Sequence, residues 1–283
     1  GRGRSGGGLA PIGEWDLMRT LVLKLGGELL ETPAQRGAIA ALAAAVVVTR
    51  PLVIVHGGGR AIDAELARRQ IAPKKIDGLR ITDAQTLEAV IAVLGGSANT
   101  DLVSALAAAD VRGVGLTGVD ASFGRAVRTA AHVATNGTVV DLGFVGDPVD
   151  ADPALIALLV RARYVPVIAS LGISVDTPGQ VLNVNADVMA CRVAVAMGDC
   201  ELVIAGGTPG VLDAQGASIP RLTLAGIADV IANGTATAGM VAKLASCGTA
   251  LERGVSSIRL IDGRGLNGLH GVGDAPGTTL VTH

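Results

Sequence analysis

Five short apolar runs, rich in valine, isoleucine and leucine, most constrain the fold of this chain. They lie at residues 21–25, 52–55, 165–169, 202–205 and 258–261. Apart from Lys24 in the first run and Arg259 in the last, their apolar residues are continuous rather than alternating with polar ones. This pattern is typical of strands that are buried on both faces of a parallel sheet.

Helical patterns separate several of these runs, at residues 33–49, 60–70, 83–94, 153–162, 186–197 and 240–253. Pro33 and Pro153 suit first turns of helices, because Thr32 and Asp152 before them can each cap a helix N-terminus. The alternation of strands and helices predicts an α/β protein: a three-layer α/β/α sandwich with a mainly parallel central sheet and right-handed crossovers.

One segment departs from this alternation. Residues 127–133 and 139–145 are strand-like runs around Asn136-Gly137, a strong signal for a two-residue hairpin turn. A hairpin cannot serve as a crossover, so we expect it to project from the sheet, where it could cover a site. We expect two lobes that share one continuous sheet, residues 18–197 and residues 198–283.

Charge and aromatic content exclude several classes of function. The net charge of −2 is too small to attract a nucleic-acid backbone or an anionic membrane. Aromatic residues make up 1% of the chain, which leaves too few for base-stacking platforms. The longest uninterrupted apolar run, residues 39–48, is shorter than the roughly 20 residues that cross a bilayer. We therefore expect neither nucleic acid nor membrane as a partner.

Cysteine usage and the start of the chain bear on location. Cys191, Cys200 and Cys247 are scattered, odd in number and without a CxxC pair, so a reducing cytoplasm is the default expectation. Residues 1–17 are rich in glycine, arginine and serine at their start and lack the apolar core of a secretory signal. We interpret them as a leader or tag outside the fold.

Two strand-to-glycine turns carry the first candidate site residues. Lys24 lies in the first apolar run ahead of Gly26 and Gly27, and a buried lysine is costly unless its ammonium group meets an anion. Residues 56–59 read His-Gly-Gly-Gly after the second run, and such a turn before a helix offers free N–H groups to a phosphate. The alternatives are an edge lysine that reaches solvent and an ordinary tight turn.

A dinucleotide-binding fingerprint is present in the wrong context. Residues 113–118 read Gly-Val-Gly-Leu-Thr-Gly, which satisfies GxGxxG. A helical pattern precedes this segment and no clear helix follows it, whereas the fingerprint needs a strand before and a helix after. We interpret it as a short strand whose glycines pack against their neighbours.

Polar residues at two later helix starts complete the candidates. Asn183 can donate to and accept from a small polar ligand, and Asp187 can orient ammonium groups while it stays ionised. Lys243 lies in the first turns of a helix that follows Gly239. The structural alternatives are a pair of capping residues and a solvated helix lysine.

Six segments in order resemble the amino acid kinase superfamily and, within it, the N-acetylglutamate kinases. They are KLGG at 24–27, HGGG at 56–59, KKIDGLRIT at 74–82, NVNAD at 183–187, GMVAKL at 239–244 and PGTTL at 276–280. The resemblance implies ATP-dependent phosphorylation of the side-chain carboxylate of N-acetyl-L-glutamate, in arginine biosynthesis. It also implies ATP and Mg²⁺ as cofactors, without naming a protein ligand for the metal.

The same resemblance implies roles for individual residues. Lys24 and Lys243 would stabilise the transferring phosphoryl group and Asp187 would hold both lysines. Arg80 would bind the substrate's α-carboxylate, and Asn183 its acetamido-acid backbone, with Gly58 and Gly59 beside them. The residues implied for phosphate and nucleotide binding are Gly26, Gly27, Gly206, Gly207, Gly210, Gly239 and Met240. The projecting hairpin would be a lid over the acyl amino acid.

The chain also departs from the pattern of such kinases. Ala205-Gly206 stands where a Ser/Thr-Asp pair is common, and Ala238 where an acidic residue or glycine is common, which bears on nucleotide binding. Residues 261–264 with His270 partly match an arginine-sensing site whose downstream acidic residue is missing. We therefore expect no strong arginine inhibition, and a homodimer.

Two other functions stay open on the same residues. One is a kinase for a related carboxylate, such as carrier-protein-linked 2-aminoadipate, which basic residues near the site (Arg68, Arg69, Lys74 and Lys75) would suit. The other is a non-catalytic amino-acid-sensing domain, which loss of the phosphate-binding lysines would mark. Lys24 and Lys243 are both present.

Overall fold

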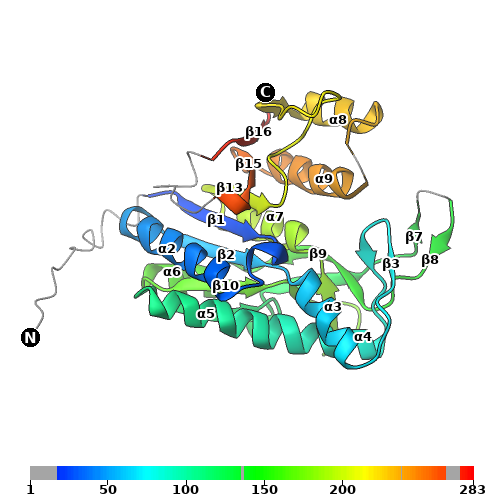
Figure 1. The fold of residues 1–283 in the computed structure, drawn as a ribbon, viewed down its shortest axis with the longest axis horizontal. Helices are drawn as coiled ribbons and strands as arrows, with labels where there is room; N and C mark the ends of the chain where they lie inside the picture. Colours follow the sequence, from blue (N-terminus) through cyan, green and yellow to red (C-terminus); the bar gives the residue numbers. More distant parts are fainter. Residues whose placement is uncertain (1–17, 135–136, 237, 266–274) are drawn as a thin grey trace, which may run out of the picture.

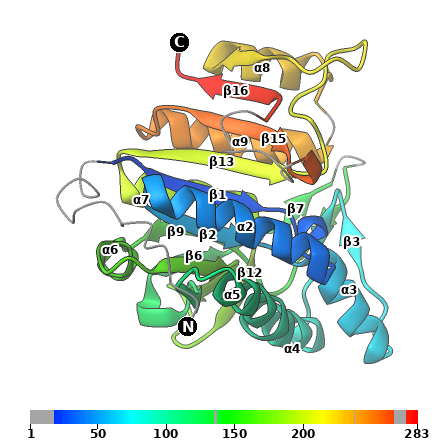
Figure 2. The same cartoon turned by 60° about the vertical axis from the view of Figure 1, so that its left-hand side comes forward.

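A computed structural model describes residues 18–134, 137–236, 238–265 and 275–283. Its centre is an eight-stranded sheet (Figures 1 and 2), in which β15 and β16 are antiparallel and the other described neighbours are parallel. The strand order is β14 (Arg221–Thr223), β16 (Gly277–Val281), β15 (Ile258–Asp262), β13 (Cys200–Gly206), β1 (Thr20–Leu25), β2 (Leu52–His56), β10 (Val165–Ala169) and β5 (Gly113–Thr117).

All five predicted strands are present in this sheet, as β1, β2, β10, β13 and β15. The GxGxxG segment forms β5, an edge strand followed by a 3₁₀ turn, η3 (Asp120–Ser122), so it is not a dinucleotide fingerprint. A Cβ on Gly115 would overlap Asn99, and a Cβ on Gly118 would overlap the carbonyl oxygen of Leu171. These glycines are there for close packing, as the sequence predicts.

Helices cover both faces of the sheet, which confirms the predicted three layers. In β1, Leu21 and Leu23 pack into a core with α2 (Pro33–Thr49) and α5 (Ala98–Ala108), whereas Val22 packs into the core on the other face. That second core contains side chains of α6 (Ala154–Arg161), α7 (Ala186–Met197), α8 (Leu224–Ala232) and α9 (Ala238–Glu252). Burial on both faces explains why the strand sequences are continuously apolar.

Helix starts follow the capping signals in part. Thr32 and Gln35 form a capping box at the start of α2, with Pro33 in its first turn. At α6 the cap lies one residue later than predicted, because Pro153 is the N-cap and Ala154 is the first helical residue. Asp152, the predicted cap, still accepts a hydrogen bond from the backbone N–H of Ala154. The helix α3 (Gly59–Arg68) follows β2, and the 3₁₀ turns η1 (Gly27–Leu29) and η4 (Gly263–Gly265) follow β1 and β15.

The helix predicted at residues 83–94 is longer than expected. α4 (Ala84–Ile91) continues through a π-helical turn, η2 (Ala92–Ser97), directly into α5. The segment 84–108 is long and apolar enough to cross a membrane by length and composition alone, a test that core helices also pass. Here Leu102 and Leu106 lie fully buried in the core.

The predicted hairpin belongs to a second, smaller sheet that the sequence did not indicate. β6 (Gly124–Arg128), β9 (Val145–Ala151), β12 (Val181–Val184) and β11 (Leu171–Ser174) pair in a closed ring. β6 and β9 continue outward into β7 (His132–Val133) and β8 (Val139–Val140), which project from the body together with β3 (Lys75–Ile76) and β4 (Leu79–Arg80) (Figure 1). Asn136 of the predicted turn lies outside the described residues, as do residues 1–17.

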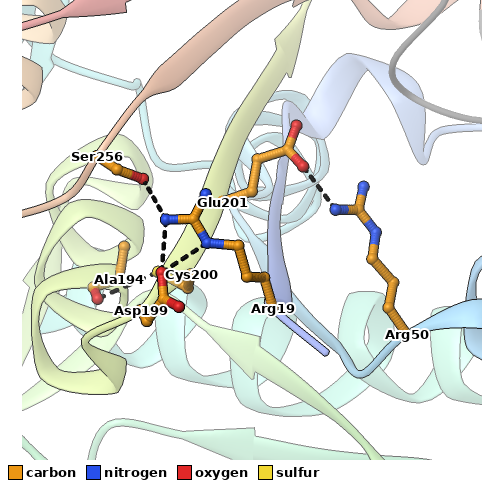
Figure 3. Close-up of polar contacts among 7 residues, drawn as sticks. All are labelled: Arg19, Arg50, Ala194, Asp199, Cys200, Glu201 and Ser256. Carbon is orange, nitrogen blue, oxygen red and sulfur yellow. Dashed lines mark hydrogen bonds and ion pairs between the residues drawn. The ribbon is translucent and has the colours of Figure 1, made fainter. Parts of the chain in front are cut away.

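Strands that follow residue 198 form one half of the central sheet and earlier strands form the other, with β1 and β13 adjacent at the junction. Arg19 bonds to Asp199 and Ser256 at the start of this junction, and Arg50 pairs with Glu201 (Figure 3). These contacts fasten the amino ends of the strands. The division into two lobes itself stays a prediction.

Candidate active site

Two glycine turns meet at the carboxyl ends of β1 and β2, the edge at which open α/β sheets bind ligands. A Cβ on Gly27 would lie 3.0 Å from Gly58 Cα and 3.0 Å from Gly59 N. Gly26 donates its N–H to the carbonyl of Ala205 at the end of β13. The turns after β1, β2 and β13 therefore converge, and only residues without side chains fit at the closest contact.

The structure brings Lys24, Asp187 and Lys243 together from three elements. Lys24 Nζ lies 2.7 Å from Asp187 Oδ1, and Lys243 Nζ lies 3.7 Å from Asp187 Oδ2. All three side chains are largely buried. Two cations around one carboxylate leave a net positive charge, which suits a polyanionic ligand such as a phosphate.

Local structure explains this meeting. Side chains alternate along a strand, so Lys24 shares the face of Val22, the face that α7 and α9 cover. Asn185 caps α7 by accepting from the N–H groups of Asp187 and Val188, which fixes Asp187 in the first helical turn. Lys243 reaches the same point from α9, one to two turns after its start.

Asp187 is ionised in this environment. Burial acts to raise its pKa, but the charges of Lys24 and Lys243 outweigh burial and hold the pKa below the ordinary value of 3.8. The carboxylate therefore keeps its charge through the neutral range and can orient both ammonium groups.

The predicted nucleotide-side glycines divide into two groups. Gly206 ends β13 beside the lysines, since a Cβ on it would lie 3.8 Å from Lys243 Nζ, and Gly207 follows it. Gly210 (φ +100°) packs instead against β16, where a Cβ would overlap Thr278 Oγ1. Gly239 is exposed at the start of α9, and Met240 packs against the core.

The predicted substrate residues line one cavity of about 220 Å³. Gly58 and Gly59 form one side, Asn183 another, and Arg80 comes from the β3–β4 hairpin. The cavity also includes Ala186, the neighbour of Asp187, so it lies beside the lysine cluster.

Arg80 is held in place by an acidic residue that the sequence did not indicate. Its side chain is 8% exposed, and its Nη2 lies 2.7 Å from Asp63 Oδ1 and donates to the carbonyl of Gly59. Asp63, on α3, also pairs with Lys75 at 2.7 Å. Arg80 Nη1 is buried and has no hydrogen-bond partner among the described residues, which leaves a donor for a ligand.

A strap, residues 142–145, leads from the projecting hairpin and borders this cavity through Val145. Thr82 donates its N–H to Leu142, and Phe144 donates to Thr82. Asn183 donates through its backbone N–H to Phe144 and through Nδ2 to Thr82 Oγ1, at 3.1 Å. At the tip, His132 Nε2 lies 2.9 Å from Asp77 Oδ2, which joins the two hairpins.

The buried His56 is a further residue that sequence reasoning did not single out as important. Its Nδ1 contacts the carbonyl of Gly57, so that nitrogen carries the proton, and Nε2 accepts from Asn99 Nδ2 at 3.0 Å. Burial lowers the pKa of His56 to about 4, and the bond to Gly57 opposes this only in part. Neutral His56 thus holds the glycine turn at residues 57–59 through its contact with the Gly57 carbonyl.

A larger cavity of about 600 Å³ lies beside β5 and the π-helical turn. It includes Asp120 and Asn99 but no cationic side chain among its lining residues, so its chemistry does not match a phosphorylated ligand. The described residues contain no group of three or more side chains that could hold a metal ion alone. His270 lies outside the described residues, and so does the side chain of Ala238.

A sequence model of the amino acid kinase family matches residues 19–262, so the chain belongs to the amino acid kinase family. Within that family it is similar to acetylglutamate kinases. The enzyme of Aromatoleum aromaticum is 41% identical over 87% of this chain and 82% of the relative. That of Solibacter usitatus is 37% identical over 93% of this chain and 99% of the relative. The resemblance to the amino acid kinase superfamily and the resemblance to the N-acetylglutamate kinases within it are both confirmed.

Solved structures agree on the fold. The protein smu.665 from Streptococcus mutans is 28% identical, with a TM-score of 0.71 over 93% of this chain and 99% of that one. N-acetylglutamate synthase from Neisseria gonorrhoeae has a TM-score of 0.75 at 23% identity, over 94% of this chain and 60% of that one. At this identity the second likeness shows the fold alone.

Proposed function

We propose that this kinase transfers the γ-phosphoryl group of ATP to the side-chain carboxylate of N-acetyl-L-glutamate and releases N-acetyl-L-glutamyl 5-phosphate and ADP. The observation that carries the proposal is one largely buried carboxylate, that of Asp187, which Lys24 and Lys243 share next to a small cavity lined in part by Arg80. The similarity to acetylglutamate kinases at about 40% identity supports the choice of substrate.

The reaction needs no nucleophile from the protein. A carboxylate oxygen of the substrate attacks the γ-phosphorus, the new P–O bond forms, and the bond from that phosphorus to the bridging oxygen breaks, so that ADP carries the electron pair away. Lys24 and Lys243 neutralise the charge on the phosphoryl oxygens, and N–H groups of Gly27, Gly58 and Gly59 donate to them. Asp187 keeps both ammonium groups in position.

Arg80 and Asn183 orient the acyl amino acid. The unpartnered Nη1 of Arg80 suits the α-carboxylate, and the ion pair with Asp63 prevents the guanidinium from turning away. Asn183 presents its amide in the same cavity, and the strap at residues 142–145 closes over it. Such positioning contributes to rate by holding the reacting atoms in line.

ATP binds, in this proposal, on the half of the sheet formed after residue 198, along Gly206, Gly207 and the start of α9. Mg²⁺ bound with the nucleotide would offset the charge of its phosphates. Mg²⁺ commonly takes one or two carboxylates plus substrate phosphates rather than a protein cage, which suits a chain whose described residues hold no such cage.

A cytoplasmic homodimer is part of the same proposal. The three cysteines are free and buried, as suits a reducing compartment. β5 is an edge strand of the central sheet, and pairing with the same strand of a second copy would extend that sheet. Sedimentation equilibrium of the purified chain tests the dimer, and a monomer at micromolar concentration would contradict it.

The test of the function is an acyl-phosphate assay with hydroxylamine trapping. With ATP and Mg²⁺ we expect hydroxamate from N-acetylglutamate, and far less from glutamate, aspartate or a carrier-linked 2-aminoadipate. The basic residues that would favour the carrier are largely paired, since Arg68 and Arg69 contact Glu65 and Lys75 contacts Asp63. Preference for the carrier substrate, or no hydroxamate at all, would overturn the proposal.

A further inference from the structure

Glu28 lies between the glycine turns of the candidate site and has no role in the proposed transfer reaction. Its carboxylate lies over Gly26, where an added Cβ would overlap both carboxylate oxygens. Cβ atoms on Gly206 and Gly207 would lie 3.5 and 3.6 Å from Glu28 Oε1. The carboxylate therefore lies between the ends of β1 and β13, where the proposed function places the phosphates of ATP.

The backbone around Glu28 is fixed from both sides. The carbonyl of Glu28 accepts a hydrogen bond from Gln35 Nε2 at 2.9 Å. The next residue, Leu29, is buried and packs so closely on η4 that a Cβ on Gly263 would overlap it. The short turn η1 is thus held rigidly, and it directs the Glu28 side chain toward the glycines.

Among the described residues the Glu28 carboxylate makes no hydrogen bond and no ion pair within 4.0 Å. Its charge acts over a longer distance on Arg264, whose pKa is raised mainly by Asp262 and in smaller part by Glu28. Lys243 approaches the same glycine, Gly206, at 3.8 Å from its added Cβ, yet no ion pair within 4.0 Å joins Lys243 to Glu28. An unpaired carboxylate beside a triphosphate is repulsive unless a cation lies between them. A divalent cation that accompanies the nucleotide would remove this repulsion.

We propose that Glu28 is the protein ligand for the divalent cation of the bound nucleotide. This inference rests on the proposed function. One carboxylate oxygen, acting directly or through one bound water, joins the phosphate oxygens around the ion, which is the arrangement Mg²⁺ favours in nucleotide sites. Gly26 leaves room for the carboxylate, since an added Cβ would overlap it, and Gly206 and Gly207 border the same space at van der Waals distance from it.

The test measures nucleotide binding rather than activity. Calorimetry with a non-hydrolysable ATP analogue is run for the wild type, Glu28→Gln and Glu88→Gln, each with Mg²⁺ and with EDTA. Glu88→Gln is the control, since it removes the same charge from an exposed side chain on α4. With Mg²⁺, Glu28→Gln should weaken binding about 10- to 100-fold. With EDTA it should bind equally well or more tightly, because an anion has left the phosphate site.

A second readout uses Mn²⁺ in place of Mg²⁺ and follows the electron paramagnetic resonance spectrum of the ion in the ternary complex. Glu28→Gln should change this spectrum, whereas Glu28→Asp should restore part of the wild-type signal and affinity. Equal loss of affinity with and without metal would mean a structural role and would overturn the inference. A wild type that binds the analogue under neither condition would overturn the proposed nucleotide site as well, so the two failures are distinguishable.

Discussion

At the scale of single residues, the candidate site is built from largely buried charges that pair with one another. Lys24 is 10% exposed in its side chain and lies in a central strand, where an unpaired ammonium group would be strongly unfavourable. In the free protein the Asp187 carboxylate pairs with this ammonium group. Because one carboxylate lies between two lysines, one positive charge of the cluster remains for a phosphoryl group. The residues that we propose to stabilise the reaction therefore also balance one another's charge in the free protein.

Lys24→Arg should fold normally and lose about 10²- to 10³-fold in kcat, because a broad guanidinium cannot replace a compact ammonium on the phosphoryl oxygens. The reverse exchange Arg221→Lys, at an exposed position near the C-terminus, is the control. Steady-state hydroxamate assays measure kcat for both. Wild-type turnover in Lys24→Arg would contradict the role of Lys24.

His56 should make stability depend on pH. Its folded-state pKa of about 4 lies below the ordinary 6.5, so between these values the unfolded chain binds a proton that the folded chain does not. The free energy of unfolding should fall by about 3 kcal/mol as the pH drops through this window. Gln at position 56 keeps an acceptor for Asn99 but cannot titrate.

Urea unfolding at pH values from 4 to 7 measures this effect. His56→Gln should lose markedly less stability than the wild type across the window, whereas His283→Gln, at the exposed C-terminus, should match the wild type. Parallel curves for His56→Gln and the wild type would mean that His56 does not stay neutral in the fold.

At the scale of elements, the strap (residues 142–145) borders the cavity that we propose for the substrate, through Val145. Gly143 (φ +75°) lies against Thr82, whose carbonyl accepts from Phe144, and a Cβ on Gly143 would overlap that carbonyl oxygen. Gly137 (φ +81°) has a similar backbone in the same hairpin but open space around it. The two glycines differ in their surroundings rather than in backbone strain.

Gly143→Ala and Gly137→Ala form a matched pair. Each should lose roughly 1–2 kcal/mol to the left-handed backbone. Gly143→Ala should lose more, and it should raise KM for N-acetylglutamate while leaving KM for ATP near the wild-type value. Thermal unfolding and steady-state kinetics measure both effects, and equal KM values for the two variants would show that the strap does not shape the cavity.

Sequence patterns predicted the strands that are buried on both faces of the central sheet. They missed elements that form only through pairing with strands distant in the sequence. The five strand runs are recognisable because burial on two faces requires continuous apolar residues. The ring of β6, β9, β12 and β11 is built from short strands that contain glycine and polar residues, so no local pattern marks it. The π-helical turn keeps the chain helical where the pattern predicted an end.

The same distinction holds in the candidate site. Lys24 stands out because a charge within an apolar strand needs an explanation. Asp63 and Glu28 do not stand out, because charged residues on surface helices and turns are common. Asp63 matters because it pairs with Arg80, and Glu28 because it lies beside Gly206. Both partners are distant in the sequence.

At the scale of the whole molecule, the two halves of the sheet meet at β1 and β13, and the lysine cluster lies across their carboxyl ends. Arg19 and Arg50 fasten the opposite ends (Figure 3). One substrate on each half would bring the reacting atoms together at this junction. Each ligand should therefore order its own half.

Hydrogen exchange with each ligand alone tests this division. A non-hydrolysable ATP analogue should slow exchange at residues 206–210 and 239–244, and N-acetylglutamate at residues 74–82 and 142–145. Protection of the second pair of segments by the nucleotide alone would contradict the assignment of the two halves.

The most direct test of the central claim is a crystal structure with ADP, aluminium fluoride, Mg²⁺ and N-acetylglutamate, which mimics the phosphoryl group during transfer. We expect the fluoride group within hydrogen-bond distance of both Lys24 Nζ and Lys243 Nζ, in line with the substrate carboxylate. A fluoride group bound elsewhere, with either ammonium group turned away from it, would contradict the account.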